Sequence, residues 1–483
     1  MLNNKEDILD NFLEQEINMA PEFAKKHTRN EKYIFPYRNE FYQIIEYINT
    51  FLEKESINRY IVMPGIRGVG KTTLLYQIYN YLFRTKNISH KDILYISCEK
   101  INYITDCNLI EIIQQYLNNF HNTTIELLNK KIYLLIDEAQ YDKNWAVAGK
   151  ILYDTNPNIF MIFTGSSALN LEYNADAARR TCKHNIPPLT YSHHLKLKYN
   201  IEIDKTRKIL KELLFNGKIN EAQKIEEKIN ELILKNNNYH GNDWYEYLLY
   251  GGFPAYFEEE DNNKIINRIE EMTNKVINTD MIQIKNFTSQ NQTNANRILR
   301  YLAIQESADV SYNKLSKYLK TSATNIENIL KVLETTHLLF HCEAYGSSSK
   351  KIRKPWKYYF ATSSIKHILA MKTGNNYRNK EKYEGILLEN MIGSKLHEIC
   401  EKSYGYYNLF YDSNKINVDF ILKEDFKNPI PIEVGKGKKD KKQAMTAITS
   451  YEAEYGIIIS NTTHQIEKTD DIIYIPPKTF AIL

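Results

Sequence analysis

Cysteine is scarce in this chain of 483 residues: there are five, and no two of them stand in a C-x-x-C pair. Their scatter argues against a zinc ribbon or a disulfide framework and is typical of a reducing cytosol. Long apolar runs are missing too, since none approaches the ~20 residues that a membrane helix needs. The first residues, MLNNKEDILDNF, contain neither a basic nor an apolar segment, so we expect no secretory signal. These absences predict a cytoplasmic protein that has no membrane partner.

An excess of charge of one sign is also missing, because the formal net charge is only +4. The overall charge therefore gives no indication of nucleic-acid binding, and any DNA-binding surface has to be local. Hydrophobic residues make up 43% and charged residues 25%, which is a globular balance. The chain is too long to fold around a single hydrophobic core, and its length predicts about three domains.

A glycine-rich segment, GIRGVGKTT at residues 65–73, follows a short apolar run and opens onto LLYQIYNYLF. It fits the pattern G-x-x-x-x-G-K-T with a strand before it and a helix after it. Polyphosphate needs several inward-pointing backbone N–H groups, which glycines allow, and it gains from the positive end of a helix dipole. Lys71 adds a point charge for the β- and γ-phosphates, and the Thr72 hydroxyl can bind Mg²⁺. The segment predicts an ATP site made by Gly65, Gly68, Gly70, Lys71, Thr72 and Thr73.

Four near-continuous apolar runs surround and follow this turn, with helical stretches between them. They occupy residues 60–63, 92–98, 131–138 and 159–167. Strands without polar alternation are buried on both faces, so we predict a parallel sheet covered by helices. We assign residues 1–57 to a helical N-terminal extension and residues 58–200 to a P-loop ATPase core.

Two carboxylates, Asp137 and Glu138, end the third run, in KIYLLIDEAQ. An aspartate at the end of a buried strand would hold Mg²⁺, and the glutamate after it could orient or deprotonate the attacking water. The alternative is a pair of solvated carboxylates that cap the next helix. The fourth run ends in Thr164, Ser166 and Ser167, whose hydroxyls could sense the γ-phosphate or could be plain turn residues.

At this point the sequence resembles a known family. The order GIRGVGKTT, LLIDEAQ, Trp145, FTGSSALNL, DAARRT and IPPLT is similar to that of prokaryotic AAA-type P-loop ATPases with a winged helix and a nuclease-like C-terminal domain. The resemblance implies an α/β fold: a parallel-sheet ATPase core with a helical lid, a winged helix and an α/β restriction-endonuclease-like domain. It also implies ATP and Mg²⁺ as ligands.

The same resemblance gives Arg180 a role. It aligns with an arginine of the family, while Arg179 stands where glycine is more usual. An arginine in that place resembles a finger that completes a neighbour's site, which would imply a homo-oligomer. The alternative is a surface salt bridge.

Residues 201–290 hold a predicted helical hairpin and a lid. The hairpin, residues 204–236, shows two helical stripes broken by Asn-Gly at 216–217. We expect it to project from the core, as a solvated spacer or a protein contact. The lid contains GGFP at 251–254, which resembles a turn of the family. Asp280 matches an acidic position of the family, to which the sequence assigns no role.

Residues 291–372 show three helical segments at helix-turn-helix spacing, followed by a hairpin with Gly346 and three serines at its tip. The second arm of this hairpin is predicted to be basic, and its cations can neutralise DNA phosphates without reading bases. They are Lys350, Lys351, Arg353, Lys354 and Lys357. The candidate recognition helix is hardly basic, and winged helices also contact proteins, so a protein partner is the alternative.

Residues 383–483 resemble a restriction-endonuclease-like domain. Glu389, Asp419 and Glu433 match three positions that bind Mg²⁺ in active members, whereas Lys436 falls one residue after the position of the lysine. Side chains alternate along a strand, so Lys436 should point away unless a bulge turns it back. We favour an inactive domain that keeps the fold for DNA or protein contact.

Three functions follow from these patterns. The leading one is Mg²⁺-dependent ATP hydrolysis in which the nucleotide state controls how the winged helix and an inactive nuclease-like domain engage DNA. The alternatives are an ATP-gated, Mg²⁺-dependent DNA endonuclease and an ATP-switched signalling scaffold. Genome defence, including antiviral defence, is a role that the resemblance alone suggests.

Overall fold

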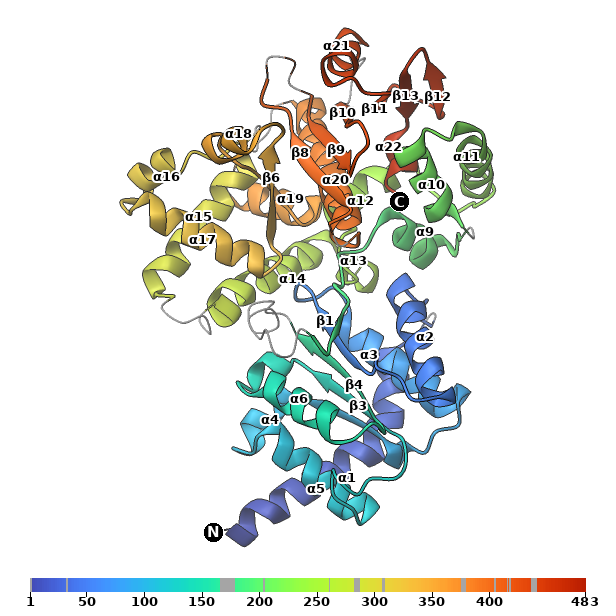
Figure 1. The fold of residues 1–483 in the computed structure, drawn as a ribbon, viewed down its shortest axis with the longest axis vertical. Helices are drawn as coiled ribbons and strands as arrows, with labels where there is room; N and C mark the ends of the chain where they lie inside the picture. The colour runs from blue at the N-terminus through green and yellow to red at the C-terminus, as the bar shows by residue number, and fades with distance from the viewer. Residues whose placement is uncertain are drawn as a thin grey trace. The chain divides into compact units, whose positions relative to one another are not determined.

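The computed structural model describes residues 2–31, 34–165, 179–202, 205–259, 261–281, 287–305, 309–374, 379–403, 405–414, 416, 418–435 and 441–483. The chain forms two compact units, Met1–Ile186 and Pro187–Leu483, and each is described by itself (Figure 1).

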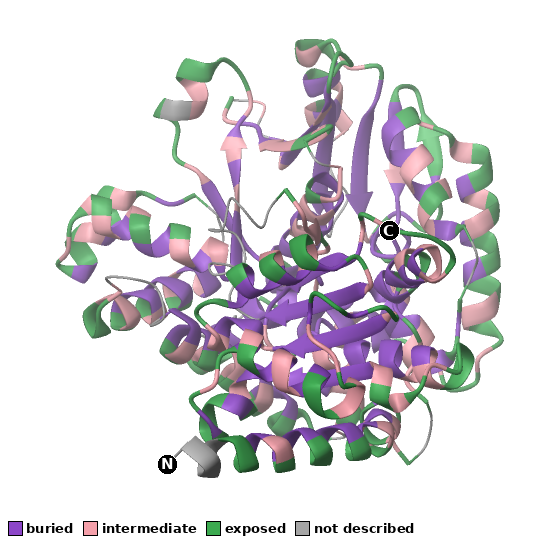
Figure 2. Ribbon diagram, turned by 60° about the horizontal axis from the view of Figure 1, so that its bottom comes forward, coloured by how far each residue is buried: buried purple, intermediate pink, exposed green. Residues whose placement is uncertain are grey.

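The first unit is built on a five-stranded parallel sheet in the order β2-β3-β4-β1-β5. Its strands are β1 (Tyr60–Pro64), β2 (Ile93–Ser97), β3 (Ile132–Asp137), β4 (Ile159–Gly165) and β5 (Cys182–Lys183). Every residue of β1, β3 and β4 is buried, as the purple strands of Figure 2 show. Ser97 pairs with Asp137 and Pro64 with Gly165, so these strands end at one edge of the sheet. The predicted parallel sheet is confirmed.

Helices surround this sheet, and the N-terminal one belongs to the core. The helices are α1 (Leu2–His27), α2 (Asn39–Glu53), α3 (Lys71–Asn80), α4 (Cys98–Ile104), α5 (Leu109–His121) and α6 (Trp145–Thr155). Short turns of helix add η1 (Tyr81–Thr85), η2 (His90–Asp92) and η3 (Ala139–Tyr141). Leu13 and Ile17 of α1 lie in one hydrophobic cluster with strand residues such as Leu134. The N-terminal extension is therefore a packed layer of this unit.

The second unit contains most of the helices. These are α9 (Tyr191–Tyr199), α10 (Thr206–Asn216), α11 (Ile219–Leu234), α12 (Asp243–Tyr250), α13 (Ala255–Glu258), α14 (Asn262–Lys275), η4 (Val276–Asp280), α15 (Ser289–Ile304), α16 (Tyr312–Leu319), α17 (Ala323–Thr335), α18 (Ser348–Arg353), α19 (Ser363–Lys372), α20 (Lys380–Glu401), α21 (Lys441–Tyr451) and α22 (Pro477–Phe480). The GGFP turn follows α12, and a Cβ on Gly252 would lie 2.3 Å from Thr362 Oγ1, so only glycine fits there.

One eight-stranded mixed sheet joins the two C-terminal regions of this unit. Its strands are β6 (Leu339–Ala344), β7 (Lys357–Phe360), β8 (Tyr407–Tyr411), β9 (Phe420–Glu424), β10 (Ile430–Gly435), β11 (Gly456–Ser460), β12 (Glu467–Thr469) and β13 (Ile472–Ile475), in the order β12-β13-β11-β10-β9-β8-β6-β7. β6 pairs in parallel with β8, with Ala344 opposite Tyr411. The hairpin predicted as a wing is thus an edge of the sheet predicted as nuclease-like.

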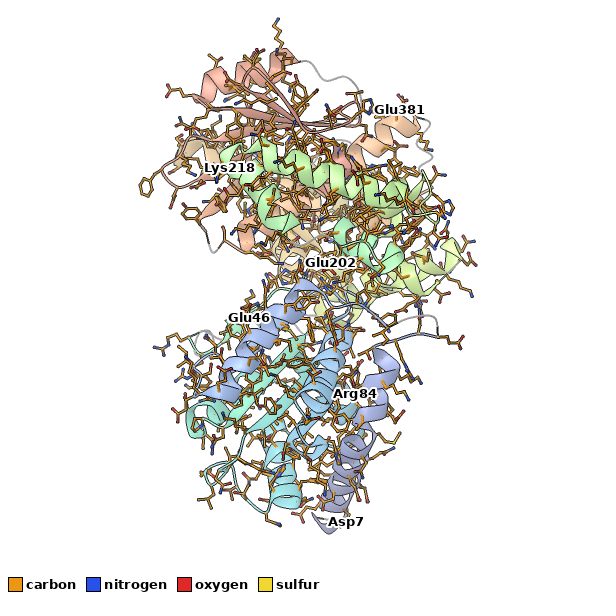
Figure 3. The ribbon with its side chains drawn as sticks, turned by 90° about the vertical axis from the view of Figure 1, so that its right-hand side faces the viewer. Asp7, Glu46, Arg84, Glu202, Lys218 and Glu381 are labelled. Atoms are coloured by element: carbon orange, nitrogen blue, oxygen red, sulfur yellow. The ribbon has the colours of Figure 1, made fainter. Side chains whose placement is uncertain are left out.

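The helical hairpin forms as predicted, but its expected projection is wrong. Gly217 ends α10 at φ +62°, and Figure 3 labels the next residue, Lys218, before α11. The apolar sides of α10 and α11 pack into the core of the C-terminal sheet, where Tyr455 OH donates to the Leu214 carbonyl oxygen at 2.9 Å. Glu226 of α11 is 3% exposed and accepts from the Ile466 amide at 2.5 Å. The hairpin is therefore structural, because its apolar stripes are buried rather than solvated.

The hairpin after α17 also differs from the prediction. Lys350, Lys351 and Arg353 lie on the short helix α18 instead of on the second strand. Lys357 does lie on that strand, β7, but it is buried. Ser347 and the serines after it start a helical turn, so the basic residues gather on the connection and not along an arm. The term winged helix stays a prediction for this segment.

Candidate functional site

The phosphate turn has the backbone that glycine makes possible. Gly68 and Gly70 have φ of +80° and +94°, a region that other residues rarely adopt. A Cβ on Gly65 would lie 2.5 Å from the Ile186 carbonyl oxygen, so the first glycine is required by close approach. Helix α3 begins at Lys71, directly after the turn. The N-terminal N–H groups of α3 and the turn amides form a ready anion site.

Lys71 folds back over this turn. Its Nζ donates to the Gly65 carbonyl at 2.8 Å and to the Ile66 carbonyl at 3.0 Å, and the residue is 5% exposed. These bonds hold a buried positive charge against the concave side of the turn. The ammonium is therefore placed to meet phosphate oxygens.

Asp137, the last residue of β3, sits among four donors. Its Oδ2 accepts from Thr72 Oγ1 at 2.7 Å and from Tyr95 OH at 3.1 Å, while its Oδ1 accepts from the Glu138 amide at 3.1 Å and from Thr164 Oγ1. Burial is the main cause that raises the pKa of Asp137, followed by the charge of Glu138, and the two threonine hydroxyls act in the opposite direction. Sequence analysis missed Tyr95 because a tyrosine inside a buried strand looks like core.

The residues around Asp137 fit Mg²⁺. The cation takes oxygen ligands and is bound through one or two carboxylates together with substrate phosphates. The Thr72 hydroxyl and the Asp137 carboxylate supply two such oxygens beside the turn. Within the described ranges, no group of three or more His, Cys, Asp or Glu residues is placed to hold a metal ion.

Glu138 has an unusual backbone. Its φ of +51° and ψ of +46° lie in the left-handed region, where a glutamate is strained. Its amide donates to Thr164 Oγ1 at 3.3 Å, and its Oε2 accepts from Gln140 Nε2. Gln140 is 1% exposed. The strained turn and this bond fix the direction of the Glu138 carboxylate. Gln140 is therefore a site residue. Sequence analysis missed it, although it lies in the DEAQ segment.

Two arginines hold the turn in place, Arg38 from outside it and Arg67 from within it. Arg38 Nη1 donates to the Val69 carbonyl at 2.7 Å, and Arg67 Nη2 donates to Tyr141 OH at 3.1 Å. Tyr141 OH in turn donates to Glu99 Oε1 at 3.1 Å, which ties the turn to α4. Neither arginine was predicted from the sequence. Arg38 is distant from the turn in the sequence, so its contact with Val69 becomes visible only in the folded structure.

Arg180 lies at the amino-terminal end of the strands, whereas the phosphate turn lies at their carboxyl-terminal end. It comes just before β5, which runs parallel to β1, whereas the turn follows the end of β1. Its Nε forms an ion pair with Asp154 Oδ1 at 2.6 Å. The salt bridge of the alternative interpretation is thus present, and by topology the arginine is remote from the ATP site of its own chain. Ser166 and Ser167 lie outside the described residues.

In the C-terminal region, the predicted carboxylates Glu389 and Asp419 lie near enough to interact through their charges. Glu389 of α20 accepts from Tyr359 OH at 3.0 Å, and burial, followed by the charge of Asp419, raises its pKa to about 7. Asp419 accepts from the Val434 amide at 2.7 Å. Glu433 is 2% exposed and accepts from Gln443 Nε2 at 3.3 Å. Lys436 lies outside the described residues.

The basic residues of α18 lie at the same end of the sheet as Asp419. β6 and β8 both end there, and β9 begins there, directly after Asp419. Lys350 Nζ donates to Asn414 Oδ1 at 2.8 Å, and Lys351 Nζ lies 4.2 Å from the Phe410 ring centroid. Lys354 is exposed just beyond α18. One surface thus combines cations with the carboxylate end of the sheet.

Comparison with known proteins first gives the class. Residues 57–195 match a family model described as an AAA domain, so the first unit holds an AAA-type P-loop domain. Residues 241–376 and 384–480 match two models described as domains of unknown function, DUF8612 and DUF4143. The chain is 33% identical over 475 residues to uncharacterized protein MJ1637 of Methanocaldococcus jannaschii, covering 98% of this chain and 94% of that protein. The chain therefore belongs to the same family as MJ1637.

Solved structures are similar only at a low level. The Walker-type ATPase PABY2304 of Pyrococcus abyssi is 16% identical, with a TM-score of 0.39 over 71% of this chain and 97% of that chain. The ORC2 protein of Aeropyrum pernix, in ADPNP-ADP complexes, is 12% identical, with a TM-score of 0.36 over 72% and 98%. In the part of the chain that the structure describes, no helix is both long and apolar enough to cross a membrane.

Proposed function

We propose that the first unit binds ATP together with Mg²⁺ and hydrolyses it. The observation that carries this proposal is the bond of 2.7 Å between Thr72 Oγ1 and Asp137 Oδ2, directly beside a glycine turn over which Lys71 is folded. A glycine turn that occurred by chance would not be expected to bring a hydroxyl, a buried carboxylate and a buried ammonium together around one point. The match to the AAA domain model supports the same conclusion.

Each residue has a chemical task in this proposal. The turn amides and Lys71 bind the phosphate oxygens and balance their charge. Thr72 and Asp137 would hold Mg²⁺, which when bound acts as a Lewis acid on the phosphoryl oxygens. Glu138 orients the attacking water and accepts its proton, and Gln140 holds the Glu138 carboxylate in position.

Labelled ATP tests the proposal. Purified protein should take up one ATP per chain in the presence of Mg²⁺ and release ADP and phosphate on a slower time scale. Well-folded protein that takes up no ATP over a titration into the millimolar range would contradict the proposal.

We propose further that Arg180 completes the ATP site of a neighbouring copy, which makes the protein a homo-oligomer. The support is its place at the sheet edge away from its own turn. Subunits with Lys71→Ala keep Arg180 but lack an ATP site, and subunits with Arg180→Ala keep the site but lack the finger. Mixing the two variants should restore ATP hydrolysis that neither shows alone. Arg179→Ala is the matched control, and a mixture as inactive as its parts would exclude the role.

We propose that the basic surface formed by α18 contacts the phosphates of DNA. Lys350→Gln, Lys351→Gln and Lys354→Gln together should weaken binding of a labelled duplex and lower the slope of log affinity against log salt by about 3. The control removes three exposed charges of α11 and its end, with Lys224→Gln, Lys228→Gln and Lys235→Gln. Equal slopes in both triple variants would rule out α18, and absent DNA binding with ATP-dependent assembly would favour the signalling scaffold.

A DNA endonuclease is the second candidate, favoured by the approach of Glu389 and Asp419. Plasmid incubated with protein, Mg²⁺ and ATP decides between it and an inactive domain. Cleavage lost in Asp419→Ala would establish the nuclease, and intact plasmid under every nucleotide condition would leave the domain as a binding module.

A further inference from the structure

Three stacked aromatic rings connect the end of α1 with the carboxylate of Asp137. His27, the last residue of α1, stacks on Tyr76 of α3, with ring centroids 4.8 Å apart and ring planes 7° apart. Tyr76 stacks on Tyr95 of β2, at 4.3 Å and 28°. Two rings that stack on one tyrosine take its two faces, so Tyr76 lies between the other two. We call these three residues the aromatic column.

The inner end of the column is fixed by the pairing of the strands. Tyr95 pairs with Leu135 and Ser97 pairs with Asp137, so Tyr95 and Asp137 point to the same face of the sheet. Tyr95 OH donates to Asp137 Oδ2 at 3.1 Å. Burial, followed by the charge of Asp137, raises the pKa of Tyr95 well above its usual value, so the hydroxyl keeps its proton and is a donor.

The outer end of the column is fixed by a contact between α1 and α3. Asn80 Nδ2 donates to the Ala24 carbonyl at 3.1 Å and to Thr28 Oγ1 at 3.0 Å. These two acceptors lie on either side of His27 in the chain, which holds the end of α1 against the helix that carries Tyr76. His27 is exposed, whereas the two tyrosines are buried. The column therefore leads from the surface of the first unit to a predicted metal ligand.

Tyr133 shows that a buried tyrosine of this sheet does not have to reach a polar group. It lies on β3, beside β2, and is fully buried. In the part of the chain that the structure describes, its hydroxyl has no hydrogen-bond partner. The bond from Tyr95 to Asp137 is therefore a property of that position and not of buried tyrosines in this sheet.

We propose that Tyr95 is a positioning residue for the Mg²⁺ site and that Tyr76 and His27 act through it, so that the end of α1 contributes to metal affinity. The proposal rests on the proposed function, because it needs Mg²⁺ beside Thr72 and Asp137. Tyr95 does not touch the metal; its hydroxyl holds Oδ2 of Asp137 in the direction of the Thr72 hydroxyl. Groups that orient a metal ligand in this way affect metal affinity strongly.

The test measures how much Mg²⁺ strengthens ATP binding to the full-length protein. Labelled ATP is titrated with Mg²⁺ and again in EDTA, and the ratio of the two affinities is compared between variants. Tyr95→Phe should lower this ratio about tenfold, because the ligand loses its orienting donor. A change that only loosened the fold would weaken both affinities and leave the ratio unchanged. Tyr133→Phe also removes a buried hydroxyl and is the matched control, with the ratio of the unaltered protein.

The possible failures can be told apart. If the unaltered protein took up no ATP at all, the proposed function itself would be wrong. If it bound ATP but Tyr95→Phe had the same ratio, or Mg²⁺ had no effect on binding, the role of Tyr95 would be overturned.

A double-mutant comparison tests the rest of the column. Tyr76→Leu should lower the ratio about threefold in the unaltered protein and cause no further loss in Tyr95→Phe, because Tyr76 acts through Tyr95. Equal losses in both backgrounds would overturn that coupling. His27→Ala changes an exposed side chain, so it should fold, and it should lower the ratio about twofold. The exposed neighbour variant Lys26→Ala should not, and a His27→Ala ratio equal to that of Lys26→Ala would overturn the role of α1.

Discussion

Asp137 of the first unit and Glu389 of the second unit are carboxylates with different surroundings. Asp137 accepts from Thr72, Tyr95, Thr164 and the next backbone amide. Among the residues that the structure describes, the donor to Glu389 is the Tyr359 hydroxyl. Burial raises the pKa of both groups. The number of donors is therefore what separates them.

The difference shows how a site is prepared for a cation. Donors around Asp137 favour its charged form and fix its oxygens beside Thr72, so that a metal meets an ordered ligand. Glu389, with a pKa of about 7, is partly protonated at neutral pH. Hydrogen-bond donors therefore favour the charged form of Asp137, whereas burial leaves Glu389 of the second unit partly protonated.

The largest expected effect on ligand binding is the loss of the ATP site in Lys71→Ala. Removing the ammonium over the glycine turn should lower ATP affinity by about 100-fold or more, about 2.7 kcal/mol, measured by equilibrium titration. Lys143→Ala, an exposed lysine of the same unit, should bind ATP normally. If both variants bound ATP equally well, the role of Lys71 would be wrong.

Glu138→Gln should separate binding from chemistry. It keeps the shape of the side chain but cannot accept a proton, so we expect ATP to stay bound while hydrolysis falls by roughly 100-fold. Single-turnover kinetics with labelled ATP measures both quantities. Normal turnover in Glu138→Gln would remove the residue from the mechanism.

Glu226→Ala tests the packing of the helical hairpin in the second unit. The change leaves the Ile466 amide and the Thr479 hydroxyl without their buried acceptor, so we expect a loss of about 3 kcal/mol in the free energy of unfolding. Urea unfolding measures it. The exposed neighbour variant Glu227→Ala should change stability by less than about 0.5 kcal/mol. An equal effect of the two variants would contradict the burial of the hairpin.

Glu389→Gln should have the smallest effect on stability, and the size of this effect depends on pH. The pKa of Glu389 rises on folding from 4.5 to about 7, so the folded protein binds the extra proton and stability falls as pH increases through that range. The amide removes this cost, and we expect it to stabilise the protein by about 2 kcal/mol at pH 8 and hardly at pH 4. Asp419, Tyr359, Lys357 and Lys366 surround the group.

Glu381→Gln is the control, since Glu381 lies exposed on the first turn of the same helix (Figure 3). Denaturant unfolding at both pH values measures the difference. If Glu389→Gln and Glu381→Gln showed the same pH dependence, the carboxyl would not be the group that titrates near neutral pH.

Much of the first unit could be predicted from the sequence because its signals are local. Glycines at fixed spacing, uninterrupted apolar strands and carboxylates at a strand end each depend on neighbours in the chain. Arg38 and Tyr95 escaped prediction because their contacts, with Val69 and Asp137, span 31 and 42 residues. Gln140 escaped because a side chain after a carboxylate pair reads as part of the next helix.

The sequence by itself determined the phosphate turn, the parallel sheet around it and the helical hairpin at Gly217, since backbone geometry and apolar periodicity act over a few residues. Only the tertiary structure decided that this hairpin is buried, that β6 joins the sheet of β8, and that His27, Tyr76 and Tyr95 stack into one column. Those pairings depend on which apolar faces cover one another, and two faces of similar composition look the same in a sequence until the chain has folded.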